Sequence, residues 1–364
     1  MLSGGVFAGG TDDLTDLRNL VDDIGERSFD AKIGHRSLPD AFDDTAWRHL
    51  EDAGLTRLDS TADSGGGPVE VAVILRSLAR HAVTVPLAET DVLACWLAGR
   101  AGIAVAESGT LTIALGDART DSGRVIAAIP NVPYAADASA VICALRDGDH
   151  LLVAALRPAD LSITKGHNTG GEPRDSVGVD APLEAFARVD GGVAAELIRR
   201  GAWARCVQII GALDAAVEFA VAHTQEREQF GRPLSAFQAV QHALASMAGE
   251  VERARAAANL AVAAAADHGF DSPQADYAIT VAKVVLGRVV PAVATSAHQL
   301  HGAIGVTIEH RLWLATQRAR SWITEFGDTG HYALRLGRLA LDADDPWDLM
   351  TGVVGGQPAR STTD

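Results

Sequence analysis

The first part of the chain carries apolar residues at helical spacing. The stretch 43–55 opens with acidic residues and reaches Gly54, a residue type that commonly ends helices. A run of glycines then breaks the chain. The stretch 69–80 again places apolar residues on one helical face, and 90–101 is predicted to be a further short helix. Residues 1–104 are therefore predicted to form a helical N-terminal domain.

The pattern changes over 105–192, where short apolar runs alternate with polar turns. Four runs are predicted strands, and they cover residues 110–115, 124–129, 140–145 and 151–156. The segment Arg146-Asp147-Gly148-Asp149 separates the last two runs and is typical of a hairpin. The Gly-rich, polar residues 164–175 predict a loop. We expect a small middle antiparallel β domain, as a sheet or a barrel.

Residues 193–342 return to a helical pattern built on small apolar residues. Four long helices are predicted, at 195–224, 237–268, 273–301 and 309–341. Pro291 is expected to kink the third of them. Long helices with short connections are typical of an antiparallel four-helix bundle. The glycines and hydroxyl residues of 343–364 predict a flexible tail. Helices, then a β domain, then a helical bundle give an α+β fold.

Composition and charge narrow the classes of function. The 364 residues are 48% hydrophobic and 21% charged, with a formal net charge of −16. This acidic balance argues against nucleic acid as a partner, because phosphates require a cationic surface. No uninterrupted apolar run reaches about 18 residues, so no membrane association is expected. The widely spaced cysteines and scattered histidines predict neither disulfides nor a metal site, and a reduced, cytoplasmic protein is the expectation.

Two motifs in the bundle segment carry a family resemblance. The first is Arg227-Glu228-Gln229-Phe230-Gly231-Arg232-Pro233-Leu234, followed by Phe237-Gln238-Ala239-Val240-Gln241. The second follows later in the chain and is Gln299-Leu300-His301-Gly302-Ala303-Ile304-Gly305, with Glu309 shortly after. In this order and spacing, and in this fold context, the two motifs resemble the bundle signatures of the acyl-CoA dehydrogenases.

The resemblance implies that this chain clamps the adenosine diphosphate half of FAD across a subunit interface. The implied cofactor-binding residues are Arg227, Phe230, Leu234, Gln238, Gln299 and Gly302. An arginine can bind the pyrophosphate through charge-assisted hydrogen bonds, and glutamines can bond to polar edges of the nucleotide. Phe230 can cover an apolar face, and Gly302 lets the backbone approach closely. His298 and His301, one turn apart, are interpreted as helix-end residues beside the cofactor rather than as a metal pair.

The same resemblance implies two positions for the carboxylate that removes the α-proton of an acyl-CoA thioester. Counting without gaps from Gly302 places one at Phe326, where the following Gly327 matches the glycine of the family. The other falls near Gly201, on the first bundle helix. Neither residue is a carboxylate. Glu325 lies one residue early, which on a helix would turn it by about 100°; a one-residue slip would restore it as the catalytic candidate.

The middle segment departs from catalytic members of the family as well. These carry a Thr-Glu-Pro…Gly-Ser-Asp stretch that holds the flavin ring and the thioester, whereas this chain has Glu107-Ser108-Gly109 without the proline or the Gly-Ser-Asp. These losses resemble the base-less subunits of actinobacterial heterotetrameric acyl-CoA dehydrogenases that act on sterol side-chain thioesters. The resemblance implies an α₂β₂ assembly in which a catalytic acyl-CoA dehydrogenase subunit holds the flavin ring, the acyl-CoA and the base.

Two alternatives stay open at the level of the sequence. A self-sufficient homomeric acyl-CoA dehydrogenase would use Glu325 as its base and would bind FAD without a partner. A non-enzymatic structural subunit would have lost the flavin altogether, and Arg227→Ala would then leave the cofactor content of its assembly unchanged.

Overall fold

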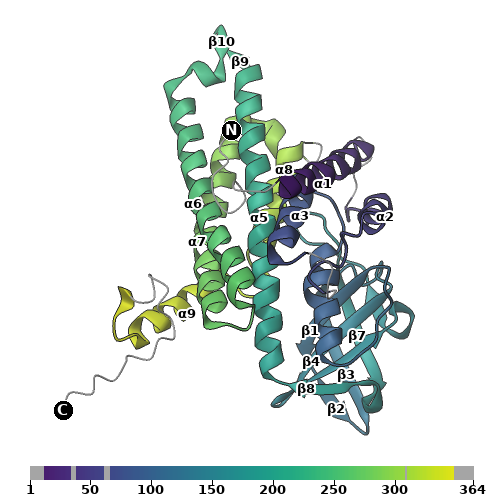
Figure 1. The fold of residues 1–364 in the computed structure, drawn as a ribbon. Helices are drawn as coiled ribbons and strands as arrows, with labels where there is room; N and C mark the ends of the chain where they lie inside the picture. Colours follow the sequence, from purple (N-terminus) through teal and green to yellow (C-terminus); the bar gives the residue numbers. More distant parts are fainter. Residues whose placement is uncertain (1–11, 34–37, 61–65, 308–309, 348–364) are drawn as a thin grey trace, which may run out of the picture.

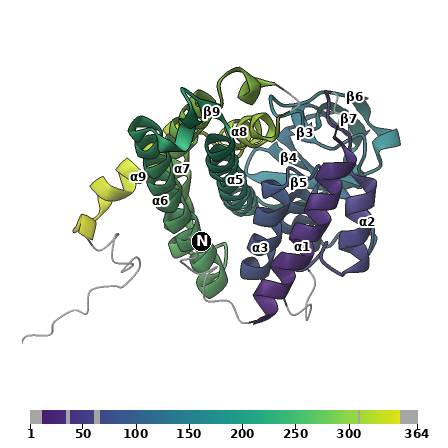
Figure 2. The same ribbon diagram turned by 90° about the horizontal axis from the view of Figure 1, so that it is seen from above.

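Helix α5 (Gly192–Glu226) runs through the middle of the molecule and joins its three parts (Figure 1). The N-terminal part packs against one side of α5 mainly through residues 68–95. Helices α6 and α7 pack against another side, and the β strands gather at the N-terminal end of α5 (Figure 2). The computed structural model describes residues 12–33, 38–60, 66–307 and 310–347. The order of helices, strands and helical bundle confirms the predicted α+β class.

The N-terminal part contains three α-helices followed by a π-helix, whose turns are wider than those of an α-helix. The helices are α1 (Asp12–Ala31), α2 (Asp44–Asp52) and α3 (Pro68–Arg80), followed by the π-helix η1 (Ala88–Cys95) and the short α4 (Trp96–Arg100). Helices α2 and α3 form where the sequence predicts them. Asp43 caps α2 by accepting a hydrogen bond of 2.9 Å from the N–H of Ala46, and Gly54 follows the helix with φ of +71°.

The stretch 90–101 differs from the single α-helix that its sequence predicts, because it is π-helical as far as Cys95. At its start, the hydroxyl of Thr90 donates to the carbonyl of Leu111 at 2.8 Å and accepts from the amide of the same residue at 3.0 Å. These two bonds anchor the widened turn on the first strand. Widened helical turns of this kind are often found at functional sites, and this one carries the buried Glu89.

The middle strands form two four-stranded sheets, with the orders β1-β4-β5-β8 and β2-β3-β7-β6. Their bounds are β1 (Leu111–Asp117), β2 (Arg119–Asp121), β3 (Arg124–Pro133), β4 (Ala140–Asp147), β5 (His150–Leu156), β6 (Ser162–Thr164), β7 (Arg174–Pro182) and β8 (Ala187–Asp190). The paired strands of these sheets are antiparallel, as predicted, except that β1 and β4 run parallel. This pair differs because the chain crosses into the second sheet and back between the two strands.

Turn positions within the β domain follow the sequence in most places. The predicted hairpin joins β4 and β5, with Asp147 opposite His150. The predicted loop at 164–175 is shorter by a residue or two at each end, since β6 ends at Thr164 and β7 begins at Arg174. Strand β3 continues beyond its predicted end to Pro133. Its register breaks after Ile129, because the next residue, Pro130, has no N–H to donate.

The C-terminal bundle consists of α5, α6 (Gln238–His268), α7 (Pro273–His301) and α8 (Arg311–Trp322), with α9 (Thr329–Asp342) packed on α7. Pro291 lies inside α7 without ending it. The predicted fourth helix at 309–341 is instead two helices, separated by a turn at 323–328. Glu309 and most of the predicted tail at 343–364 lie outside the described residues.

One large apolar core joins the bundle to the N-terminal helices, and Trp203 and Trp322 are among its fully buried side chains. A second, smaller core lies between the two sheets and includes Val125 and Cys143. Helix α5 contributes buried residues along almost its whole length. The arrangement makes α5 the element from which side chains can reach every other part of the molecule.

Helix α5 and the segment Pro273–Val306 are long and apolar enough to cross a bilayer by length and composition. In each, more than half of the most apolar window is buried inside the protein, 56% and 61% respectively. The core helices of a helical bundle have these properties without any membrane. The expectation of no membrane association therefore stays a prediction.

Candidate functional site

The two predicted base positions lie next to each other. Gly201 is on a buried face of α5, and Phe326 is in the turn at 323–328 between α8 and α9. A Cβ atom at position 201 would be 2.4 Å from Cδ1 of the Phe326 ring, closer than any real carbon contact. Two positions counted from separate motifs thus come together, and an aromatic ring that cannot accept a proton fills the space between them.

The turn at 323–328 changes the interpretation of Glu325. Phe326 and Gly327 have φ of +55° and +102°, so the backbone passes through the left-handed region and cannot continue α8. The expectation that Glu325 sits on a helix, rotated about its axis away from the substrate, is wrong for this reason. The direction of its carboxylate is set by the turn and by what binds it.

Side chains from α7 and α9 hold the turn in place. Lys283 is fully buried, and its Nζ donates to the carbonyl oxygens of Ile323 and Glu325, each at 2.8 Å. The hydroxyl of Tyr332 donates to the carbonyl of Phe326 at 2.9 Å. Three backbone carbonyls of the turn are therefore satisfied by long side chains. The position of the Phe326 ring depends on these contacts.

Both carboxylate oxygens of Glu325 are bound by arginines. Nε of Arg174 lies 2.9 Å from Oε1, and Nε of Arg205 lies 2.7 Å from Oε2. Arg205 also donates to Glu89 at 2.5 Å, and Arg174 reaches Glu172 at 3.5 Å. The side chains of these four partners are at most 5% exposed. A buried ion-pair network therefore occupies the space between α5, η1, β7 and the turn.

The network makes Glu325 a poor proton acceptor. Burial by itself would raise the pKa of the Glu325 carboxyl, but Arg174 and Arg205 outweigh it and lower the pKa to about 2. A general base works best with a pKa near the operating pH and with an oxygen free to reach the proton. Glu325 has neither property, so its geometry is that of a structural ion-pair partner.

Arg200, the residue before Gly201 on α5, places a charged side chain between two aromatic rings. The guanidinium carbon of Arg200 lies 4.5 Å from the ring centroid of Trp96 and 4.2 Å from that of Phe270. Its nitrogens bind Asp59 at 2.7 Å and Glu196 at 3.0 Å. Arg200 is thus held between two rings and two carboxylates. Cation–π contacts and charge-assisted hydrogen bonds of this kind are strongest where water is excluded.

Sequence reasoning missed this buried network. Its members are distant in the chain, and no short motif joins Glu89, Arg174, Arg205 and Lys283. One signal was present: Arg205 and Lys283 each interrupt a run of apolar residues on a helix that is otherwise buried. A charged residue on a buried face requires a partner. That rule identifies both residues as members of an internal ion-pair or hydrogen-bond cluster, although it does not identify the partners.

The first predicted clamp segment is a hairpin at the far end of α5. Strands β9 (Glu228–Gln229) and β10 (Arg232–Pro233) are joined by Phe230 and Gly231, whose φ values of +53° and +76° indicate a type I′ turn. The amide of Leu234 donates to the carbonyl of Arg227 at 2.8 Å and closes the hairpin. The hairpin lies at the extreme end of the bundle in Figure 1. It exposes 92% of Phe230.

The second clamp segment ends α7 and lies at the same end of the bundle. Gly302 has φ of +65°, and a Cβ atom there would meet nothing within 4 Å, so the backbone conformation rather than crowding favours glycine. Gln299 is exposed one turn earlier. The ring of His301 stacks on the ring of His223 from α5, with centroids 4.5 Å apart. This contact ties the end of α7 to the end of α5.

The exposed side chains of both segments suit the nucleotide half of FAD. Within the described residues, the side chains of Arg227, Gln238 and Gln299 have no hydrogen-bond partner. An available guanidinium, two available amides, an exposed ring and an open glycine backbone match a pyrophosphate, a ribose and an adenine. The donor set therefore fits this group, and its side chains are exposed at the surface of the chain.

The turn at 107–109 is already engaged within the chain. The amide of Gly109 donates to Glu51 at 2.5 Å, and its carbonyl accepts from Arg57 at 3.0 Å. A Cβ atom at Gly109 would lie 2.6 Å from Oγ of Ser139. These backbone groups are therefore already used by α2 and its neighbours.

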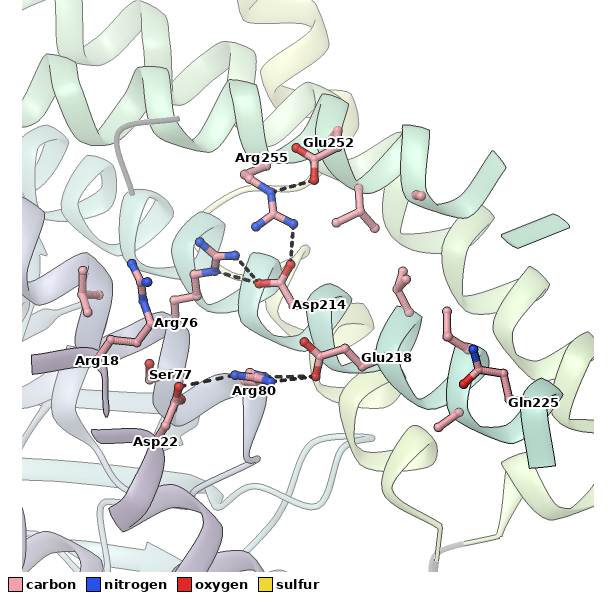
Figure 3. A pocket seen from close by; sticks show the side chains of 16 residues that line it. Arg18, Asp22, Arg76, Ser77, Arg80, Asp214, Glu218, Gln225, Glu252 and Arg255 are labelled. Carbon is pink, nitrogen blue, oxygen red and sulfur yellow. Dashed lines mark hydrogen bonds and ion pairs between the residues drawn. The ribbon is translucent and has the colours of Figure 1, made fainter. Parts of the chain in front are cut away.

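A separate cavity of about 510 Å³ lies between α1, α3, α5 and α6 (Figure 3). Its lining contains four arginines and four carboxylates, so the charges balance. Asp214 on α5 binds Arg76 from α3 and Arg255 from α6, each at 2.7 Å, and Arg80 bridges Asp22 and Glu218 (Figure 3). The cavity lies away from Gly201 and Phe326. Its ion pairs join the N-terminal helices to the bundle.

The chain is similar in sequence and in fold to known acyl-CoA dehydrogenases. Residues 190–330 match the family model described as "Acyl-CoA dehydrogenase, C-terminal domain". The acyl-CoA dehydrogenase FadE27 of Mycobacterium tuberculosis is 29% identical over 371 aligned positions, which cover 90% of this chain and 97% of FadE27. Residues 190–330 belong to the acyl-CoA dehydrogenase family, and the whole chain has the acyl-CoA dehydrogenase fold. A match to the acyl-CoA dehydrogenase IpdE2 of Mycolicibacterium smegmatis is 34% identical but spans only 32% of that relative.

Solved acyl-CoA dehydrogenases share the complete fold. The ChsE4-ChsE5 complex from Mycobacterium tuberculosis contains a chain that superposes with a TM-score of 0.79 at 23% identity, with 92% of this chain and 98% of that chain covered. The Tcur3481-Tcur3483 steroid acyl-CoA dehydrogenase variant gives a TM-score of 0.78 at 26% identity, with 91% and 98% covered. Acyl-CoA dehydrogenases of this fold are FAD-dependent oxidoreductases.

Proposed function

We propose that this chain is the non-catalytic subunit of a heteromeric, FAD-dependent acyl-CoA dehydrogenase. It supplies the clamp for the nucleotide half of FAD, and a catalytic acyl-CoA dehydrogenase partner supplies the base and the acyl-CoA site. The observation that carries the proposal is the contact between Gly201 and Phe326. Both positions at which the family places its base are occupied by residues without a carboxylate, and they fill each other's space.

The neighbouring charged residues support the same conclusion. Glu325 is bound on both oxygens by Arg174 and Arg205, and the pKa of its carboxyl is lowered to about 2. A carboxylate in this state cannot take an α-proton at neutral pH with useful efficiency. The self-sufficient homomeric enzyme, which would need Glu325 as its base, is therefore disfavoured.

The clamp residues have kept the chemistry that the base positions lack. Arg227 would hold the pyrophosphate, Phe230 would cover an apolar face of the nucleotide, and Gln238 and Gln299 would bond to its polar edges. When bound, FAD supplies the acceptor for the hydride that leaves the β-carbon of the thioester. This chain's part is to bind and orient the nucleotide end and to exclude water around it. Retention of the clamp also disfavours a subunit that has lost flavin.

The acyl group is proposed to be the side chain of a sterol. Support comes from the Tcur3481-Tcur3483 protein, which is named a steroid acyl-CoA dehydrogenase and is 26% identical over nearly the whole chain. The ChsE4-ChsE5 protein is named a complex and has the same fold, which supports a two-chain assembly. A cytoplasmic α₂β₂ heterotetramer is the arrangement that we propose.

Co-expression with a catalytic acyl-CoA dehydrogenase subunit, sought among the products of the adjacent genes, tests the proposal. The complex should be yellow, with bound flavin measured by absorbance, whereas the chain alone should bind little FAD. Arg227→Ala should weaken flavin binding by the complex by about tenfold or more, because it removes a charge-assisted hydrogen bond. The matched control is Arg157→Ala, which removes an exposed arginine of the β domain. Unchanged flavin content in Arg227→Ala, or a homotetramer with one FAD per chain, would overturn the proposal.

A further inference from the structure

Three imidazole rings from three elements meet at the clamp end of the bundle. His223 is in the last turn of α5, His301 is the last residue of α7, and His310 is the N-cap of α8. The rings of His223 and His301 stack with an interplanar angle of 19°, and the ring of His310 lies edge-on to His301 with centroids 4.9 Å apart. No cluster of metal ligands is found within the described ranges of the chain. The rings pack on one another instead.

The hydrogen bonds of two rings show whether Nδ1 carries a proton in each. Nδ1 of His301 lies 2.8 Å from the carbonyl oxygen of Ala297, which can only accept, so Nδ1 carries the proton. Nε2 of the same ring is buried without a hydrogen-bond partner among the described residues. Nδ1 of His310 accepts a bond of 3.1 Å from the amide of Leu312, which requires a lone pair there. His310 is therefore a neutral imidazole, and His301 carries a proton on Nδ1.

The stacked rings join two parts of the chain that are far apart in sequence. The carbonyl of His223 accepts the amide of Arg227 at 2.9 Å, so this ring sits one turn before the hairpin. His301 directly precedes Gly302, whose positive φ ends α7. The stack of His223 on His301 is thus a side-chain contact between the end of α5, which leads into the hairpin, and the end of α7.

We propose that His223, His301 and His310 are positioning residues that set the distance between the two halves of the nucleotide clamp. This inference rests on the proposed function. The hairpin carries Arg227 and Phe230, and the end of α7 carries Gln299. Since a bound nucleotide must meet both segments at once, a change in their separation weakens binding even when every contacting side chain is retained.

The surroundings lower the pKa of both His301 and His310. Burial lowers the pKa of His301 to about 4, and the neighbouring imidazoles of His223, His298 and His310 act in the same direction. Burial followed by the guanidinium of Arg320 on α8 lowers the pKa of His298, and burial followed by His223 and His298 lowers that of His310. The hydrogen bond from His301 to the carbonyl of Ala297 acts in the opposite direction, and burial outweighs it.

Replacing His223 tests the positioning role, because its ring makes the stack while its side chain has no hydrogen-bond partner among the described residues. In the complex with the catalytic subunit, His223→Ala should raise the flavin dissociation constant by roughly three- to tenfold, which is what an aromatic pair contributes. His223→Phe keeps a ring at the same place and should bind flavin within about twofold of the native complex. His268→Ala, an exposed histidine at the opposite end of α6, is the control.

Flavin affinity is measured by fluorescence titration, and assembly is checked by size-exclusion chromatography. If His223→Ala does not assemble, His223→Leu, which fills the space without a ring, takes its place. Equal weakening in the phenylalanine and alanine variants, or native affinity in both, overturns the positioning role. If Arg227→Ala also leaves flavin binding unchanged, the proposed function itself has failed. If Arg227→Ala weakens binding and the His223 variants do not, only the positioning role has failed.

Discussion

The ring of Phe326 packs against the backbone of Gly201 so closely that any side chain at position 201 would collide with it. Gly201 lies on α5, whereas Phe326 lies in the turn between α8 and α9. Lys283 and Tyr332 hold that turn in place through hydrogen bonds to its carbonyls. The contact explains why α5 carries a glycine in the middle of a long buried helix, where glycine is otherwise unfavourable. It also predicts how the site responds to substitution.

Gly201→Ala should lower the free energy of unfolding by about 1–3 kcal/mol, because the added methyl overpacks the site. Alanine alone would favour the helix by about 1 kcal/mol, so a net loss identifies the collision. Combining it with Phe326→Ala should recover much of the loss, as expected for residues in contact. Urea denaturation of the native chain, the two single variants and the double variant measures this coupling. Simple additivity of the two substitutions would show that the residues do not touch.

Glu325→Gln should destabilise the chain without abolishing turnover by the assembled enzyme. A pKa lowered from 4.5 to about 2 corresponds to roughly 3 kcal/mol of stability. The contribution is complete above the unfolded pKa of 4.5 and is lost as the pH falls through about 2. Chemical denaturation at pH 7 and near pH 2 should show a large difference between variant and native chain that shrinks on acidification.

Turnover separates a structural glutamate from a catalytic one. Glu107→Gln, at an exposed position of the β domain, is the matched control for loss of a carboxylate. The initial rate of the assembled complex with Glu325→Gln should stay within about threefold of the native rate, since no step passes through this group. Loss of activity by several orders of magnitude, with the fold intact, would restore Glu325 as the base.

Lys283 gives the chain a stability that increases with pH in the alkaline range. Burial, its largest influence, lowers the pKa of Lys283 from 10.5 to about 8. Between these values the unfolded chain binds more protons than the folded chain, so stability rises with pH. The slope contributed by this group approaches 1.4 kcal/mol per pH unit, a total of roughly 3 kcal/mol.

Lys283→Met removes this pH dependence. The variant also leaves the carbonyls of Ile323 and Glu325 without their donor, so it should be less stable than the native chain near neutral pH. Guanidinium denaturation at intervals between pH 7 and 10 gives the difference curve, in which other titrating groups cancel. A difference that does not change with pH would show that Lys283 titrates normally.

The sequence was sufficient to predict the order of the parts, because helical periodicity and strand-length runs are local signals. Helices α2, α3, α5, α6 and α7 begin and end within a few residues of their predicted bounds. The break at 323–328 was not predicted. Its cause is a pair of left-handed residues, Phe326 and Gly327, of which only the glycine is a recognisable signal.

The parts of the site that consist of continuous sequence motifs were predictable, whereas the parts that join residues distant in the chain were not. The hairpin at 227–234 and the end of α7 are continuous motifs, and counting from them led to Gly201 and Phe326. The network around Glu325 joins η1, β7 and α5, and long-range pairing of this kind leaves no spacing in a single sequence. The parallel pairing of β1 and β4 was missed for the same reason, since it depends on a crossover between sheets.

Phe230→Ala should leave the isolated chain intact and weaken the assembled one. The side chain is 92% exposed, so its removal should change the free energy of unfolding by no more than about 0.5 kcal/mol. An exposed aromatic residue at the tip of a rigid hairpin is the kind of residue that contributes most to binding another surface. Flavin affinity of the complex with the catalytic subunit should therefore fall by about tenfold.

Phe230→Gly distinguishes the effect of the ring on flavin binding from the effect of the backbone turn. Phe230 has φ of +53°, a conformation that glycine adopts without strain, so this variant should keep the hairpin at least as stable as the native one. Loss of flavin binding in both variants assigns the effect to the ring. Retention of binding in the glycine variant alone would instead assign it to the shape of the turn. Leu341→Ala, which removes an exposed apolar side chain of α9, controls for general loss of surface hydrophobicity.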